Sequence, residues 1–355
     1  MKLGVFLSYD TAVEVAQEAE RLGYAVALAP EGFKSDAVSV LGAVAARTER
    51  IGIASGVMQI PARTPVLAAL TAATLDAMSD GRFRLGLGVS NPDVSSGWYG
   101  VPFGQPLSRV REYVAVVRMA LRGEPVRHAG RYFHLPPPGS AEAAHLRAAP
   151  VRADIPVYLA GVGPSSISLA GEIADGWIGV FCSPQRLAQS MRWLRAGRAR
   201  AGLGMAGFEV LPSVPLGTGS EPAAAAEPLR GYFANFIGLG SPTGNVYGAL
   251  ATRMGYGSAV HEIGRKCRAG DRAGAACAVP FELMDETSLL GSAERIAPRM
   301  AEYARAGVTT LGVTLLYRSV AEQLAALRTA AEALRLAVST SEPGLSVLLP
   351  PARKI

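Results

Sequence analysis

The sequence predicts an α/β fold, a (β/α)8 or TIM barrel, and three observations support this prediction. Short apolar runs of strand length alternate with segments whose apolar residues recur at helical spacing. This strand-helix unit recurs eight times, as a closed parallel barrel requires. The length of 355 residues fits one domain of this kind. An open doubly wound sheet is the alternative architecture for the same alternation.

Apolar patterning and capping signals place the individual elements. Gly23 ends the first helix, and Ser35 or Asp36 can cap the second. Gly56 interrupts the third strand, where a glycine indicates a bulge or the close approach of another backbone or a ligand. Strands are predicted at 3–7, 25–30, 51–59, 83–90, 157–161, 177–181, 208–216 and 310–316, and helices at 11–22, 36–48, 64–79, 108–121, 165–174, 184–201 and 320–334.

Three segments lie outside this alternation. Residues 219–307 are too long for a simple crossover between strands seven and eight, and their helical patterns (229–238, 245–256, 260–269 and 293–306) predict a helical insertion near the barrel mouth. Residues 123–154 are rich in Pro, Gly and Ala and are expected to be mostly irregular. The barrel is therefore expected to span 1–335, with 336–355 as a loose C-terminal tail.

Composition limits the class of protein. The apolar runs are punctuated by Arg, Asp and Gly, which fits neither a membrane span nor a signal segment. The three scattered cysteines indicate a reducing compartment and a cytoplasmic protein. The four histidines have no metal-ligand spacing, so no metal site is expected. The net charge of +6 comes mostly from Arg spread over helices. It indicates either a solvated surface or attraction for a polyanionic small ligand, and no nucleic-acid motif accompanies it.

Barrels of this type carry their active sites where the strands end and the loops begin. The candidate site residues therefore follow the predicted strands, and they are Ser8, Glu31, Gly56, Val57, Met58, Gln59, Ser90, Asn91, Ala160, Gly161, Val162, Gly163, Pro164, Ser165 and Ser166.

The best candidate for binding an anion is the stretch 161–166, called the anion loop below. Its two glycines permit close backbone approach, and Pro164 suits the first turn of a helix. Ser165 and Ser166 add hydroxyl groups beside the exposed amides of a helix N-terminus, where a phosphate is electrostatically favoured. An ordinary strand-helix turn with a serine cap is the alternative interpretation.

Glu31 is the candidate for proton exchange, because it follows the second strand and a carboxyl group in an apolar barrel mouth can serve as an acid or base. A surface ion pair with Lys34 is the alternative. Ser90 and Asn91 are candidates for hydrogen bonds to the edge of a ligand ring, or for simple turn formation.

Three stretches together, 51–65, 82–98 and 155–177, resemble the luciferase-like flavin/deazaflavin oxidoreductases. The nearest branch contains methylenetetrahydromethanopterin reductase and other enzymes of the deazaflavin coenzyme F420. The resemblance runs from about Met1 to Arg335. It implies that the anion loop holds the cofactor phosphate and that Gly56-Val57 is a non-prolyl cis peptide behind the deazaflavin ring. Several relatives have Asp-His where this chain has Pro30-Glu31, and Val162 stands where some relatives have a glycine.

The resemblance implies an F420-dependent oxidoreductase that transfers a hydride between the deazaflavin and a small organic substrate. A C=C or C=N bond of a secondary-metabolite intermediate is one expected target. The alternatives are an FMN-dependent monooxygenase on the same barrel and a non-catalytic flavin- or deazaflavin-binding protein. A homodimer is expected, without nucleic-acid or membrane partners.

Overall fold

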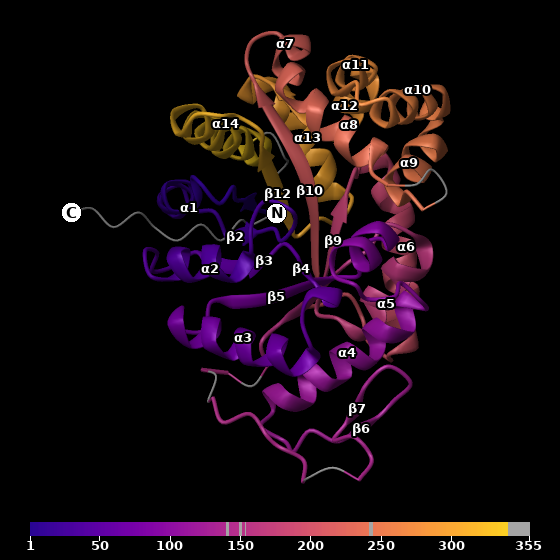
Figure 1. Ribbon diagram of the computed structural model, residues 1–355. Helices are drawn as coiled ribbons and strands as arrows, with labels where there is room; N and C mark the ends of the chain where they lie inside the picture. The colour runs from indigo at the N-terminus through magenta and orange to yellow at the C-terminus, as the bar shows by residue number, and fades with distance from the viewer. Residues whose placement is uncertain (140–141, 149–150, 153, 241–243, 340–355) are drawn as a thin grey trace, which may run out of the picture.

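The computed structural model describes residues 1–139, 142–148, 151–152, 154–240 and 244–339, and these form the predicted barrel (Figure 1). Eight parallel strands close on themselves, because β10 pairs with both β9 and β12 and β12 pairs with β1. In order around the barrel they are β1 (Lys2–Phe6), β2 (Val26–Ala29), β3 (Gly52–Ser55), β5 (Phe83–Gly88), β8 (Val157–Ala160), β9 (Gly176–Val180), β10 (Glu209–Thr218) and β12 (Thr310–Leu315). The predicted fold class is confirmed.

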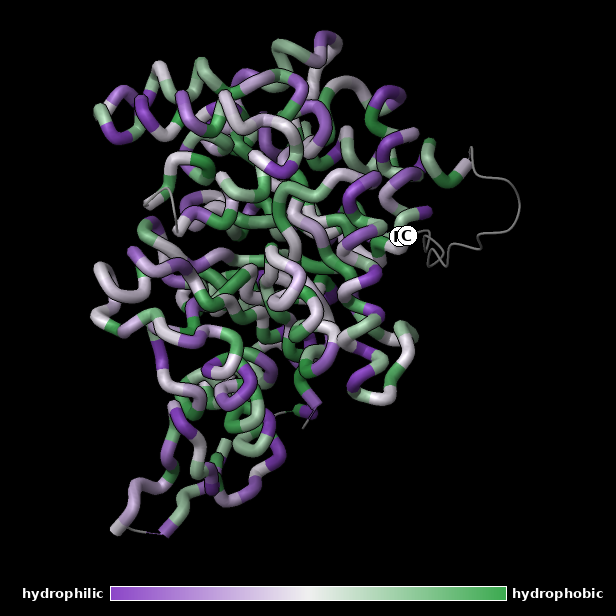
Figure 2. Tube along the Cα trace, turned by 90° about the vertical axis from the view of Figure 1, so that its right-hand side faces the viewer, coloured by the Kyte–Doolittle hydropathy of each residue, from purple (hydrophilic) through white to green (hydrophobic). Residues whose placement is uncertain are grey.

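Helices surround these strands, as the ring of ribbons in Figure 1 shows. They are α1 (Ala12–Arg21), α2 (Ala37–Ala45), α3 (Pro65–Met78), α4 (Pro106–Leu121), α5 (Pro164–Ile173), α6 (Pro184–Arg200), α13 (Ala293–Arg305) and α14 (Val320–Ser339). Apolar residues gather toward the middle of the molecule and polar residues toward its outside (Figure 2). The main core lies between the strands and this ring of helices.

The insertion between β10 and β12 consists of short helices that gather at the top right of Figure 1. They are α7 (Pro222–Ala226), a 3-10 turn at Glu227–Leu229, α8 (Arg230–Gly238), α9 (Val246–Ala251), a π-helical turn at Thr252–Tyr256, α10 (Gly257–Arg268), α11 (Arg272–Cys277) and α12 (Phe281–Thr287). They share a second core that includes Phe233, Ile263 and Met284. Phe181, which follows β9, stacks on Phe233 with ring centroids 5.1 Å apart and so ties the insertion to the barrel.

Three differences from the sequence-based expectation concern the C-terminal part of the chain. The helix expected at 293–306 within the insertion is α13, which packs on α14 and α6 as a member of the outer ring. An unexpected short strand, β11 (Leu289–Gly291), precedes it and pairs with β10. Helix α14 continues to Ser339, so the first residues of the expected tail are helical; the rest of the tail, 340–355, lies outside the described residues. Each difference arises because contacts between distant segments lengthen a helix, add a strand, or move a helix from the insertion to the outer ring.

The segment after α4 is mostly irregular in its described part, as expected. It holds one short antiparallel pair, β6 (His128–Ala129) and β7 (His134–Leu135), which projects at the bottom of Figure 1. The Glu112 carboxylate on α4 anchors this hairpin by accepting hydrogen bonds from the backbone N–H groups of Arg131, Tyr132 and Phe133.

Helices α5 and α6 approach each other backbone to backbone through two glycines. A Cβ atom added at Gly171 would meet the backbone oxygen of Leu194, and one added at Gly197 would meet that of Ser168. Because backbone atoms cannot move aside as a flexible side chain can, this contact admits only glycine at both positions. It fixes α5, which begins with the anion loop, against α6.

We expect Gly171→Ala to destabilise the protein, because overpacking a tight contact typically costs about 1–3 kcal/mol. Thermal or denaturant unfolding measures the change. The matched control is Gly231→Ala in helix α8, where an added Cβ meets nothing within 4 Å. The control should be neutral or slightly stabilising, since alanine is the better helix former. A Gly171→Ala protein as stable as the parent would show that the helices can separate without loss.

Candidate functional site

The third barrel strand is interrupted by a bulge at its C-terminal end. Ala54 pairs with Arg84 and Met58 pairs with Leu87, so four steps along one strand oppose three along the other. The peptide bond Gly56-Val57 lies inside this bulge and is cis, as the resemblance implied. The chain then continues as β4 (Met58–Gln59) and a 3-10 turn at Ile60–Ala62.

The bulge determines where its side chains point. A Cβ atom on Gly56 would meet Phe6 and Leu28 inside the barrel, and Val57 also packs in that interior cluster. Met58, by contrast, is buried in the core between strands and helices. Since an extra residue shifts the alternation of side chains, Val57 becomes the wall of the barrel mouth and Met58 is withdrawn from it. Met58 could therefore reach a ligand only through its backbone.

A carboxylate clasps the bulge from the neighbouring strand. Glu31 Oε2 accepts a hydrogen bond from the backbone N–H of Gln59 (2.8 Å), and its backbone oxygen accepts one from Gln59 Nε2 (3.0 Å). Glu31 Oε1 is 2.8 Å from Arg63 Nη2, and the two side chains are only 5% and 12% exposed. The partner of Glu31 is thus Arg63 and the bulge, rather than Lys34 as the alternative from sequence had it.

The Arg63 guanidinium was not a candidate from the sequence, although it lies only four residues beyond Gln59. Its pattern, an arginine between two prolines before a helix, resembles an ordinary loop. Three contacts hold Arg63 near the barrel mouth. Its guanidinium group pairs with Glu31 and lies 3.5 Å from Asp36 Oδ1. Its backbone oxygen accepts a hydrogen bond from the Tyr113 hydroxyl at 3.2 Å. Only the tertiary structure brings these groups together.

Two exposed aromatic residues meet after neighbouring strand ends: Phe33, two residues beyond Glu31, and Trp98, the last residue of a π-helical turn. Phe33 and Trp98 meet edge to face with centroids 5.2 Å apart, and both side chains are 61% exposed. Burial, followed by the nearby Glu31 charge, raises the pKa of Tyr99. Tyr99 therefore stays a neutral hydroxyl at physiological pH, able to donate a hydrogen bond near the mouth.

Two of the polar candidates are engaged in local structure. The Ser8 hydroxyl donates to Asp10 Oδ1 at 2.6 Å, and Asn91 Oδ1 accepts from the backbone N–H of Val94 at 3.0 Å. The Asn91 bond lies at the start of a π-helical turn at Asp93–Trp98, which is the turn-forming role considered from sequence. Ser90 has a positive φ of 65°, a conformation that turns the chain sharply after β5.

The anion loop follows β8 and leads into α5, as predicted. The Trp177 indole N–H donates to the Gly161 oxygen at 2.9 Å, and the Gly163 N–H donates to Ser166 Oγ at 3.1 Å. Gly163 lies in open space, where an added Cβ would meet only Ser166 Oγ at 3.9 Å. The first turn of α5 leaves backbone N–H groups without intrahelical acceptors, as every helix N-terminus does. The Ser166 hydroxyl in turn donates to the Gly163 oxygen, which is the serine-capped turn considered as the alternative, and phosphate binding by the remaining amides stays a prediction.

A pair of hydroxyl groups in the barrel mouth was also missed from the sequence. Ser213 Oγ of β10 and Thr314 Oγ1 of β12 lie 2.9 Å apart, and Ser213 is buried. The available signal was a serine in the otherwise apolar strand 208–216. A strand pattern alone does not say which of its faces lines the mouth.

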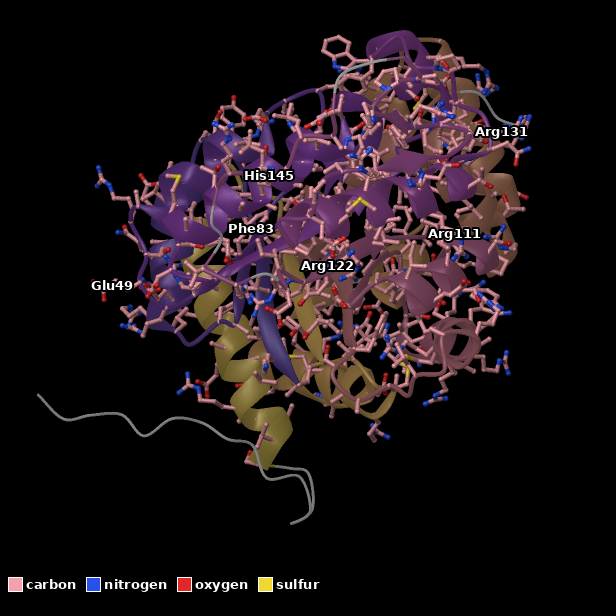
Figure 3. All side chains as sticks on the ribbon, turned by 90° about the horizontal axis from the view of Figure 1, so that it is seen from below. Glu49, Phe83, Arg111, Arg122, Arg131 and His145 are labelled. Carbon is pink, nitrogen blue, oxygen red and sulfur yellow. The ribbon has the colours of Figure 1, made fainter. Side chains whose placement is uncertain are left out.

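The positive charge of the chain is dispersed. Figure 3 shows Arg111, Arg122 and Arg131 well apart from one another. Among the residues that the structure describes, no His, Cys, Asp and Glu side chains form a group that could hold a metal ion. In the same part of the chain, no helix combines the length and apolarity of a membrane crossing.

Comparison with known proteins identifies the family. Residues 3–310 match the model of the luciferase-like monooxygenases, and the chain belongs to this family. A Mycobacterium tuberculosis protein, provisionally named a coenzyme F420-dependent oxidoreductase, is 36% identical over 92% of this chain and 99% of its own length. The 5,10-methylenetetrahydromethanopterin reductase of Archaeoglobus fulgidus is 28% identical over 76% of this chain and 79% of its own length.

Among solved structures, the coenzyme F420-dependent tetrahydromethanopterin reductase from Methanopyrus kandleri superposes with a TM-score of 0.82. The match covers 94% of this chain and 98% of that one at 22% identity, which is a likeness of fold. The family and its F420-dependent relatives mark this protein as an oxidoreductase.

We expect Glu31→Gln to weaken cofactor binding by about tenfold or more, because an amide cannot replace the charge-assisted bond that holds Arg63 and the bulge. Fluorescence titration with the cofactor measures it, and Glu14→Gln on the exposed side of α1 is the control.

The prediction from sequence, that Glu31 exchanges a proton with substrate, implies the opposite result for Glu31→Gln in these measurements. In that case Glu31→Gln would bind the cofactor normally, and its turnover and pH profile would change. The two measurements together decide between a positioning and a catalytic role.

Proposed function

We propose that this protein is a coenzyme F420-dependent oxidoreductase that transfers a hydride between the deazaflavin and a small organic substrate. The names of its sequence relatives support the cofactor. The observation that carries the proposal is the clasped bulge at the mouth of the barrel, beside an open cradle for a phosphate. A cofactor with a flat ring, a ribityl chain and a phosphate needs both features in one site.

The residues at the bulge fit such a ring. Gln59 Oε1 and Arg63 Nη1 are buried and have no hydrogen-bond partner among the described residues. One is an acceptor and the other a donor, and buried polar atoms of this kind normally have partners. The pyrimidine part of a deazaflavin offers N–H and C=O groups that match this pair. We therefore assign Gln59 and Arg63 to the ring edge, Val57 to the ring face and the anion loop to the phosphate.

In this mechanism the protein binds the cofactor and the substrate, orients them, and controls the transfer of one proton. When bound in its reduced form, the deazaflavin supplies a hydride, and reduction of a C=C or C=N bond then consumes one proton as well. The apolar side chain of Val57 would keep water from the face of the ring. The hydroxyls of Ser213 and Thr314 near the mouth can relay that proton from solvent, whereas Glu31, paired with Arg63 as a carboxylate, must first take up a proton before it can give one. We also propose that the substrate carries a C=C or C=N bond, as in a secondary-metabolite intermediate.

An FMN-dependent monooxygenase is the second candidate. The description of the family supports it, and FMN has the same kind of ring, ribityl chain and phosphate. A binding protein without catalysis is a third, since the Asp-His of several relatives is absent. These candidates make different predictions about cofactor preference and turnover.

Titration of the protein with each cofactor tests the proposal, and we expect tighter binding of F420 than of FMN. Gly163→Val should weaken F420 binding, because its side chain would fill the cradle, while the open space around Gly163 should leave stability unchanged. Fluorescence quenching and thermal unfolding measure the two effects. Tight FMN binding without a response to F420 would reverse the order of the candidates, and normal binding by Gly163→Val would move the phosphate elsewhere.

We also propose a homodimer formed through helices α2 and α3. Neither helix carries a lysine or arginine, and their one acidic residue, Asp76, is buried and bonded to Arg152. The outer face of α3 exposes Leu67, Leu70 and Met78 by 48%, 42% and 52%. An uncharged face cannot attract a partner of opposite charge. It can pack against the same face of a second copy, because a two-fold apolar contact needs no charge complementarity.

Leu70→Lys is expected to shift the protein toward the monomer, because it places two lysines against an apolar two-fold contact. Size-exclusion chromatography with light scattering measures the mass, and Leu203→Lys on the loop after α6 is the control with a similarly exposed leucine. A monomeric parent protein, or a Leu70→Lys protein that remains a dimer, would contradict this interface.

A further inference from the structure

A cleft lies between helix α6 and the insertion, and it begins at the anion loop. Its enclosed volume is about 40 Å³, and the rest of its space is open to solvent. The lining includes Gly161 and Val162 of the anion loop, Arg186 and Trp193 of α6, and Leu250 and Arg253 of the insertion. The cleft thus continues outward from the place assigned to the cofactor phosphate.

One face of α6 is committed to this cleft. Arg186, Ser190 and Trp193 are spaced by four and three residues, so they share a face of the helix, and all three line the cleft. On the adjacent face of the helix, Leu187, Met191 and Leu194 are buried in the main core, and Leu187 also borders the cleft. Because that core fixes the rotation of α6, the part-buried Arg186 side chain is directed toward the insertion.

Neither arginine of the cleft has an acidic partner. In the described part of the chain, no side-chain hydrogen bond or ion pair engages the guanidinium group of Arg186 or Arg253, whereas many arginines elsewhere pair with Glu or Asp. Two like charges that line one cleft repel each other. An anion between them would turn this repulsion into attraction, so the cleft is suited to an acidic ligand.

We propose that Arg186 and Arg253 bind the acidic tail of the deazaflavin coenzyme, the linked glutamates that extend beyond its phosphate. This inference rests on the proposed function. Guanidinium groups recognise carboxylates through paired hydrogen bonds, and a tail leaving a phosphate at Gly161–Gly163 would enter the cleft directly. FMN ends at its phosphate and has no group to place there. The cleft would then select the deazaflavin coenzyme over FMN.

The experiment compares three probes by fluorescence titration: the coenzyme with its glutamate tail, the form that keeps the phosphate but lacks the glutamates, and the chromophore that lacks both. The parent protein should prefer the tailed form. In the double variant Arg186→Ala/Arg253→Ala this preference should fall by about tenfold, with binding of the chromophore unchanged. The preference of the parent should also shrink as ionic strength rises.

Matched variants separate charge from packing. Arg195→Ala removes an exposed arginine nine residues along the same helix, half a turn away from Arg186, and should keep the preference. Arg253→Lys should restore part of it, since the charge remains. If the double variant proves unstable, Arg253→Ala alone is informative, because Arg253 is exposed and its replacement leaves the core intact.

Three results would overturn the assignment. A double variant that still prefers the tailed form would show that the tail lies elsewhere. An equal loss for the tailed and the tail-less phosphorylated forms would assign the arginines to the phosphate instead. A parent protein that binds none of the three probes would refute the proposed function and the tail site together, whereas binding of the chromophore leaves the proposed function standing whatever the arginines do.

Discussion

The candidate site depends on one carboxylate held between a strand bulge and an arginine. Glu31 occupies a position from which both of its oxygen atoms and its backbone oxygen accept hydrogen bonds from Gln59 and Arg63. Because these donors come from the segment after the third strand, the clasp ties two neighbouring strand ends into one unit. Val57, Gln59 and Arg63 are then presented to the barrel mouth in fixed orientations.

Close packing of glycines supports the other half of the site. The anion loop begins α5, and α5 is set against α6 by the paired glycines Gly171 and Gly197. The same helix α6 presents Arg186 and Trp193 to the insertion. The contact between these two helices therefore also sets the distance between the anion loop and the cleft lined by Arg186.

The helical insertion between β10 and β12 distinguishes this barrel from a plain (β/α)8 barrel. Its own core and the stacking of Phe181 on Phe233 make it a separate cluster joined to the end of β9. A barrel supplies a common frame, and loops and insertions at the strand ends distinguish one chemistry from another. Here the insertion contributes Arg253 to the cleft, and the segments after β2 and β5 contribute the exposed aromatic pair Phe33 and Trp98.

The sequence by itself determined the barrel, because short apolar runs and helical spacing of apolar residues are local properties that the chain carries in every context. It also determined the turn between β8 and α5, since Gly, Pro and Ser favour a helix start through local backbone and side-chain geometry; that this loop binds a phosphate stays a prediction. It could not place Arg63 beside Glu31, join Ser213 to Thr314, or assign α13 to the outer ring. Those outcomes depend on which strand ends meet around a closed sheet. Only the tertiary structure fixes that register, because it follows from packing between residues far apart in the chain.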